Sequence, residues 1–84
     1  MRPELVFEED ADRYLQQLEG DLNQVALMRA IHSRLNFLED HPGSHSNRPL
    51  GYRGGQWRID VEDHMIIWEM RDDLIVVRYI GPQL

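Results

Sequence analysis

Hydrophobic residues recur along this chain at two spacings, and each spacing predicts a different kind of element. Residues 4–7 form a short apolar run typical of a strand. Apolar residues then recur every three or four positions, which predicts amphipathic helices near 10–19 and 21–39, separated at Gly20. The first half of the chain is therefore expected to form a strand followed by a helical hairpin.

Polar residues at the predicted helix starts support these two helices. Asp10 can cap the first helix, and Asp21 with Gln24 has the spacing of a capping box at the second. The apolar stripe of the second helix is expected to consist of Leu22, Val25, Met28, Ile31, Leu35 and Leu38. The following segment, 39–51, is rich in Pro, Gly and Ser without periodicity, which indicates a loop.

The second half of the chain has the composition of strands. Runs rich in β-branched and aromatic residues predict strands near 55–62, 65–71 and 74–80. Two-residue acidic turns are expected at Asp63–His64 and Asp72–Asp73, so that the three strands form an antiparallel meander. The predicted fold is α+β, with both helices packed on one face of the sheet.

Alternation along the strands sorts their side chains onto two faces. The face toward the helices is expected to hold Trp57, Ile59, Val61, Ile66, Trp68, Met70, Ile75, Val77 and Tyr79. The opposite face would hold an apolar patch of Met65, Ile67, Leu74, Val76 and Ile80. Two helices cannot cover both faces of one sheet, so this patch suggests a binding partner. The residues expected to be most buried are Leu15, Leu18, Ile31, Leu35, Trp57, Ile59, Ile66, Trp68 and Val77.

Length and composition narrow the class of protein. The 84 residues suffice for one domain, 1–84, with one core. The absence of cysteine excludes disulfides and thiolate-bound metals, and no apolar run approaches the roughly 20 residues of a membrane span. We therefore expect a cytoplasmic protein without a cofactor. A net charge of −6 disfavours general attraction to nucleic acid.

Arginines are the candidate ligands for an anion. All nine basic residues are arginine, and three of them lie in the acid-free segment 47–58. Arg48, Arg53, Arg58 and Arg78 are expected to form any anion-binding site. A cross-strand ion pair of Arg58 with Glu69 and solvation of the loop arginines are the alternative interpretations. The four histidines share no metal-ligand spacing, so no metal site is predicted.

The order of these elements resembles the RelE/ParE superfamily of small bacterial toxins. The resemblance rests on the segments PLGYRGGQWR (49–58), DHMIIW (63–68) and DDLIVVRYIG (72–81). Members of the RelE branch are ribosome-dependent mRNA endonucleases, those of the ParE branch inhibit DNA gyrase, and both are neutralised by an antitoxin that wraps the toxin. The resemblance thus implies a toxin of a type II toxin–antitoxin system, with an antitoxin as partner and the ribosome with its mRNA as a target to consider.

Departures from the nuclease pattern change this picture. Met65 stands where the nucleases usually have arginine, and Ile80 with Gly81 stands where they tend to place a histidine or tyrosine beside a basic residue. RNA cleavage requires a base, an acid and cations. Only Arg58 and His64 remain as catalytic candidates, with His64 either a base or a solvated turn residue. Weak or absent nuclease chemistry is therefore expected.

Two other functions compete with a toxin. One is a catalytically inactive RelE-like interaction module that forms a homodimer or docks a partner through the apolar sheet face. The other is an unrelated small α+β enzyme or ligand-binding domain with the same order of elements. A helical hairpin on one face of an antiparallel meander would argue against the latter.

Overall fold

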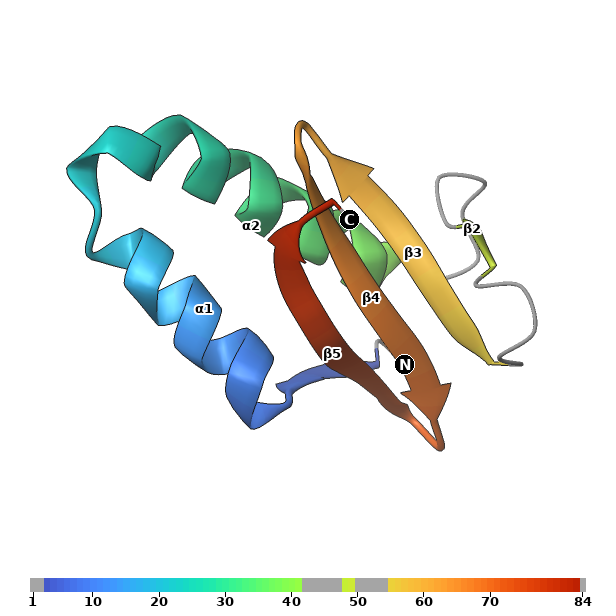
Figure 1. The fold of residues 1–84 in the computed structure, drawn as a ribbon. Helices are drawn as coiled ribbons and strands as arrows, with labels where there is room; N and C mark the ends of the chain where they lie inside the picture. Colours follow the sequence, from blue (N-terminus) through green and yellow to red (C-terminus); the bar gives the residue numbers. More distant parts are fainter. Residues whose placement is uncertain (1–2, 42–47, 50–54, 84) are drawn as a thin grey trace.

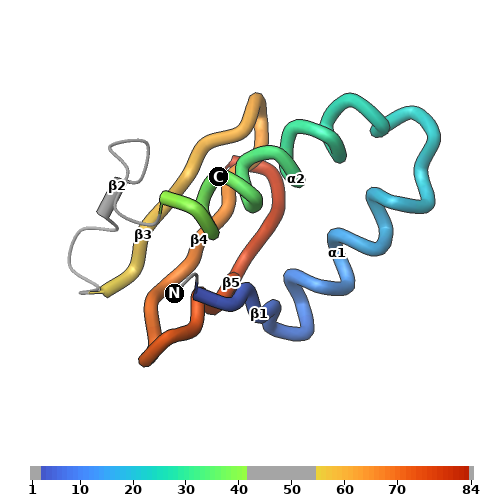
Figure 2. The backbone as a smooth tube through the Cα atoms, turned by 180° about the vertical axis from the view of Figure 1, so that it is seen from behind, coloured from blue at the N-terminus to red at the C-terminus, as the bar shows by residue number. Residues whose placement is uncertain are grey.

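A computed structural model of the chain describes residues 3–41, 48–49 and 55–83 (Figure 1). It confirms the α+β fold, in which a layer of two helices covers one side of a sheet, as the view from behind in Figure 2 also shows. The elements in chain order are β1 (Glu4–Phe7), α1 (Glu9–Glu19), the 3₁₀ turn η1 (Leu22–Gln24), α2 (Val25–Asp40), β2 (Arg48–Pro49), β3 (Gln56–Val61), β4 (His64–Arg71) and β5 (Leu74–Pro82).

The sheet has the strand order β1-β5-β4-β3-β2. Strands β3, β4 and β5 form the predicted antiparallel meander, with β4 at its centre. Strand β1 pairs with β5 in parallel, because the chain leaves β1 for the helical layer before returning to the sheet. The two-residue strand β2 lies in the segment expected to be a loop and pairs with the outer side of β3. The helices thus cover one face, and we call the other one the open face.

The second helix begins later than its apolar pattern predicts. Asp21 does cap this region, since its carboxylate accepts a hydrogen bond from the backbone N–H of Asn23 at 2.9 Å. The residues after it form a 3₁₀ turn, whose tighter winding changes the direction of the side chains relative to an α-helix. Leu22 and Val25 are consequently 89% and 44% exposed, and the expectation that they join the buried stripe is wrong. Leu27 is buried in their place, on the stripe of Leu27, Ile31, Leu35 and Leu38.

The first helix also begins slightly earlier than predicted. Helix α1 starts at Glu9, and Glu8 occupies the N-cap position without a side-chain cap bond. Asp10 therefore lies within the first turn rather than at the cap, where its negative charge still favours the helix dipole.

The turn between β3 and β4 lies one residue earlier than expected, at Glu62–Asp63. Val61 consequently pairs with His64, which is the first residue of β4 rather than part of the turn. This offset shifts the pairing of the two strands by two positions, so each side chain keeps its predicted face. Arg58 now lies beside Ile67, and the expected cross-strand pair of Arg58 with Glu69 is wrong.

An irregularity between β4 and β5 changes faces at the end of the sheet. Trp68 pairs with Val77, whereas Ile67 pairs with Tyr79, so Arg78 is an extra residue in β5. A bulge of one residue reverses the alternation of every side chain beyond it. Ile80 is therefore on the helix side and 2% exposed, and its assignment to the open-face patch is wrong. Tyr79 takes the opposite position, on the open face next to Ile67.

The core lies between the helices and the sheet. Eight of the nine residues expected to be most buried belong to the buried cluster, from Leu15 in α1 to Val77 in β5. The ninth, Trp57, is partly buried and stacks on Trp68 with a ring-centroid distance of 6.1 Å. This packing positions the edge of α1 against the β3–β4 turn, where the polar cluster described below is found.

Candidate functional site

The two catalytic candidates from the sequence lie on opposite faces of the sheet. Arg58 is paired with Ile67 and belongs to the open face. His64 is paired with Val61 and points toward the helices, where its side chain is 10% exposed. The sheet itself therefore separates the candidate base from the candidate cation.

Acidic side chains hold the open-face arginines. Arg58 Nε donates a hydrogen bond to Asp60 Oδ1 at 2.6 Å. Arg78 donates to Glu69 Oε1 at 2.6 Å and lies 3.1 Å from Glu8 Oε1. The hydrogen bond to Glu69, followed by the negative charge of Glu8, raises the pKa of Arg78. These guanidinium groups already have anionic partners, so a phosphate would have to compete with carboxylates for them.

Of the two remaining predicted anion ligands, only the backbone of Arg48 is described by the structure. Arg48 is in β2, and its backbone is in register with Arg58. Arg53 lies outside the described residues. The role of both as anion ligands stays a prediction.

The apolar patch of the open face is smaller than its sequence suggests. Ile67 and Leu74 are partly exposed, whereas Met65 and Val76 are only 5% and 7% exposed although no helix covers them. Tyr79 contributes to this closure, because its ring lies against Gly81, where a Cβ would collide with the phenol oxygen. Gly81 in turn pairs with Met65. The patch is therefore a shallow apolar surface next to paired arginines.

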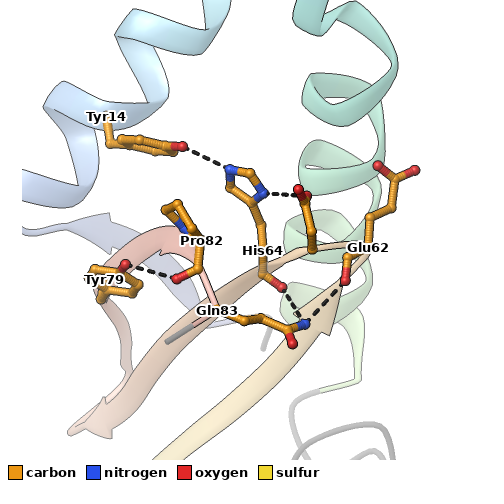
Figure 3. A network of polar contacts seen from close by, with 7 residues as sticks. Tyr14, Glu62, His64, Tyr79, Pro82 and Gln83 are labelled. Carbon is orange, nitrogen blue, oxygen red and sulfur yellow. Dashed lines mark hydrogen bonds and ion pairs between the residues drawn. The ribbon is translucent and has the colours of Figure 1, made fainter.

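A polar cluster with a buried member, His64, lies on the helix side of the sheet (Figure 3). The hydroxyl of Tyr14, on α1, is 2.7 Å from His64 Nε2. His64 Nδ1 is 2.7 Å from Asp63 Oδ1, in the β3–β4 turn. The hydrogen bond from His64 lowers the pKa of Asp63. Burial, together with the nearby Tyr79 and the charge of Asp63, raises the pKa of Tyr14.

The end of β5 closes over the same turn. The side-chain amide of Gln83 donates hydrogen bonds to the carbonyl oxygens of Glu62 and His64 at 3.1 and 3.2 Å (Figure 3). The backbone N–H of Gln83 donates to the carbonyl of Asp63 at 2.9 Å. On the neighbouring side, the Tyr79 hydroxyl donates to the carbonyl of Pro82 at 3.1 Å. These bonds fix the backbone of Glu62–His64 and hence the position of the imidazole.

Sequence reasoning found His64 but missed its partners. The helical spacing groups Tyr14 with the apolar residues of the first helix, and the sequence predicts Asp63 only as a turn residue. Tyr14 and His64 are 50 positions apart, so no local pattern joins them. The one available signal was the adjacency of Asp63 and His64 in the chain.

The described residues lack two further kinds of feature, a cluster of metal-ligand side chains and a membrane-spanning helix. Among residues 3–41, 48–49 and 55–83, no group of three His, Asp or Glu side chains could hold a metal ion. In the same part of the chain, no helix is long and apolar enough to cross a membrane. Both ring nitrogens of His64 already have partners within the protein.

Comparison with known proteins connects this fold to toxins. The chain has the fold of the YoeB dimer structure from Staphylococcus aureus, with a TM-score of 0.80 over 100% of both chains and 10% sequence identity. No curated protein matches the chain. A family model described as "ParE toxin of type II toxin-antitoxin system, parDE" matches residues 7–84, nearly the whole sequence. The chain therefore belongs to the ParE toxin family of type II toxin–antitoxin systems.

Proposed function

We propose that this toxin acts by binding an essential bacterial protein, with little or no cleavage of RNA. The observation that supports this proposal is the placement of Arg58 and His64 on opposite faces of the sheet. The ParE branch of the superfamily inhibits DNA gyrase, which makes gyrase the first target to test.

The chemistry of RNA cleavage supports the same proposal. Attack by a 2′-hydroxyl requires a base within hydrogen-bond reach of it and cations at the phosphate in one place. On the open face, Arg58 is held by Asp60 and Arg78 by Glu69, and arginine cannot accept a proton at neutral pH. His64 is on the other side and already bonded to Tyr14 and Asp63. The described residues thus supply cations without a neighbouring base.

The partner that neutralises the toxin is proposed to cover the open face. Its accessible apolar surface comes from the partly exposed Ile67 and Leu74 and from Val6 of β1, which is 38% exposed, whereas Met65 and Val76 are largely buried. An antitoxin segment with apolar side chains would bury this surface. Its acidic side chains could engage Arg71, whose side chain is 62% exposed, in competition with Glu69, to which Arg71 donates a hydrogen bond at 2.9 Å.

A homodimer is the second candidate use of this face. The structure similar in fold is that of a dimer, and the same apolar surface could pair with its copy. Sedimentation of the purified protein at micromolar concentration distinguishes the two, because a species of about twice the 10.0 kDa chain mass is expected only for the dimer.

Induced expression of the chain alone in a bacterial host tests the proposed activity. We expect arrested growth, no cleavage of mRNA on translating ribosomes, and inhibition of supercoiling when purified protein is added to gyrase. Arg58→Ala should weaken the arrest if the open face binds the target. Arg13→Ala, which removes an exposed ion pair on α1, is the matched control and should leave the arrest unchanged.

Two outcomes would contradict the proposal. Ribosome-dependent cleavage that disappears in Arg58→Ala would show that the open face is a nuclease site. Growth unaffected by the chain, with an intact folded protein, would favour an inactive interaction module instead.

A further inference from the structure

The cluster around His64 has a defined hydrogen-bond polarity. Asp63 is a carboxylate at neutral pH, since its pKa is lowered by the bond to His64, so it can only accept and His64 Nδ1 must carry a hydrogen. In a neutral imidazole the other nitrogen, Nε2, is then an acceptor. Tyr14 keeps its proton because its pKa is raised, and its hydroxyl donates to Nε2 over 2.7 Å. The hydrogen bonds therefore run from the Tyr14 hydroxyl to the His64 imidazole and from the imidazole to the Asp63 carboxylate.

This order is the arrangement that activates hydroxyl nucleophiles in enzymes. Such sites require a base within about 2.6–3.2 Å of the hydroxyl, and a third group that orients the base. Both distances here are 2.7 Å. The His64 side chain is 10% exposed and the His64 carbonyl accepts a hydrogen bond from Gln83, so the ring has little freedom to turn away from Tyr14. Tyr14 itself is only partly buried.

We propose that Tyr14 is a reactive nucleophile toward uncharged acyl electrophiles, with His64 as its base and Asp63 as a positioning residue. In this reaction the phenol oxygen attacks the carbonyl carbon while its proton passes to His64 Nε2. The bond to the leaving group then breaks with its electron pair, which leaves O-acyl-Tyr14. The proton on His64 is afterwards released to solvent.

The charges around Tyr14 favour an uncharged electrophile. The acidic residues of the adjacent turn are Glu62 and Asp63, and both are exposed. The open-face arginines Arg58 and Arg78 lie on the other side of the sheet, bonded to Asp60 and Glu69. A phosphoryl donor would bring negative charge toward these two carboxylates while the open-face arginines stay bonded to their own acidic partners, whereas an ester brings no charge. The site therefore selects acyl over phosphoryl donors.

Acetylation by p-nitrophenyl acetate tests the proposal on the whole chain. The protein has no lysine and no cysteine, so its four histidines and three tyrosines are the main side chains that compete for the reagent. Tyr79 is an internal control, because it is also a tyrosine but its hydroxyl donates to the Pro82 carbonyl rather than to a base. Mass-spectrometric mapping should show Tyr14 acetylated at least about tenfold faster than Tyr79, since general-base assistance contributes about 10²-fold or more.

Three variants separate reactivity from structure. Tyr14→Phe should abolish the fast phase, and His64→Gln should reduce the reaction of Tyr14 to that of Tyr79. Asp63 is 85% exposed, so Asp63→Asn should fold normally, slow the reaction about tenfold, and alter the ¹⁵N shifts of the His64 ring as its tautomer changes. Equal rates at Tyr14 and Tyr79, or a rate unchanged in a folded His64 or Asp63 variant, would overturn the proposal. If His64→Gln does not fold, Asp63→Asn decides alone.

Discussion

Single residues with unusual backbone angles fix the two hairpins of the meander. Glu62 and Asp72 each occupy the first position of a two-residue turn and have φ angles of 56° and 57°. This left-handed region disfavours residues with a Cβ, but aspartate tolerates it better than glutamate does. The β3–β4 turn therefore contains the more strained of the two residues.

Replacement of Glu62 by glycine should relieve this strain. We expect Glu62→Gly to raise the free energy of unfolding by about 0.5–1 kcal/mol, because a left-handed non-glycine residue costs about 1–2 kcal/mol and the added flexibility of the unfolded chain returns part of it. Asp72→Gly is the matched control, and its free energy of unfolding should rise less. Urea denaturation measures both, and a lower midpoint for Glu62→Gly would contradict the interpretation.

The charge of Asp63 should make stability depend on pH. The folded-state pKa of Asp63 lies below its ordinary 3.8, so its bond to His64 stabilises the protein above pH 3.8 and is lost as pH falls through the folded value. Asp63→Asn should therefore be less stable than wild type at pH 5–7, and the difference should shrink as the pH falls below 3.8. Urea denaturation midpoints of wild type and Asp63→Asn, measured across this pH range, would show the change in the difference. A difference that grows on acidification would have the wrong sign.

At the scale of elements, the bulge in β5 determines which side chains enter the core. The extra residue Arg78 exchanges the faces of Tyr79 and Ile80 relative to a regular strand. The exchange buries an apolar side chain that would otherwise face solvent, and it brings Tyr79 onto the open face. Burial of Ile80 favours the bulged pairing over the regular one.

Truncation of Ile80 tests this register. Ile80 is 2% exposed, so we expect Ile80→Ala to lower the free energy of unfolding by about 2–4 kcal/mol through lost burial and a cavity. Ile67→Ala, on the partly exposed open face, should cost clearly less. Chemical denaturation of both variants makes the comparison. Equal losses would indicate that β5 runs without the bulge.

At the scale of the whole molecule, one buried cluster connects the helices with the sheet. It includes residues of α1, α2, β3, β4 and β5, and Trp68 on the central strand is its largest fully buried side chain. A chain of this length buries only about 60% of its unfolded surface, so it has little stability in reserve.

Removal of the Trp68 ring should accordingly unfold most of the protein. We expect Trp68→Ala to cost about 3–5 kcal/mol, which is a large part of the stability of so small a protein. Trp57→Ala is the matched control and should cost less, because Trp57 is only partly buried. Thermal unfolding followed by circular dichroism would distinguish them. A cooperative transition with unchanged midpoint in Trp68→Ala would contradict the assigned core.

Local pattern predicted most of the fold. Helical and strand periods identified both helices and the meander, because burial of one face imposes a regular spacing on apolar residues whatever the partner. The same pattern predicted correctly which face of the sheet holds Trp57, Ile59, Ile66 and Trp68. An offset of two positions in the pairing of β3 with β4 leaves the alternation of side chains unchanged.

The sequence by itself thus determined the kinds of elements, their order, the buried helix stripes in outline and the lack of any cysteine chemistry. Only the tertiary structure decided the bulge at Arg78, the late start of α2 and the meeting of Tyr14 with His64. The physical reason is the range of the interactions. Periodicity reflects neighbours a few residues apart, whereas the face of Ile80 and the partner of His64 depend on packing between segments far apart in the chain.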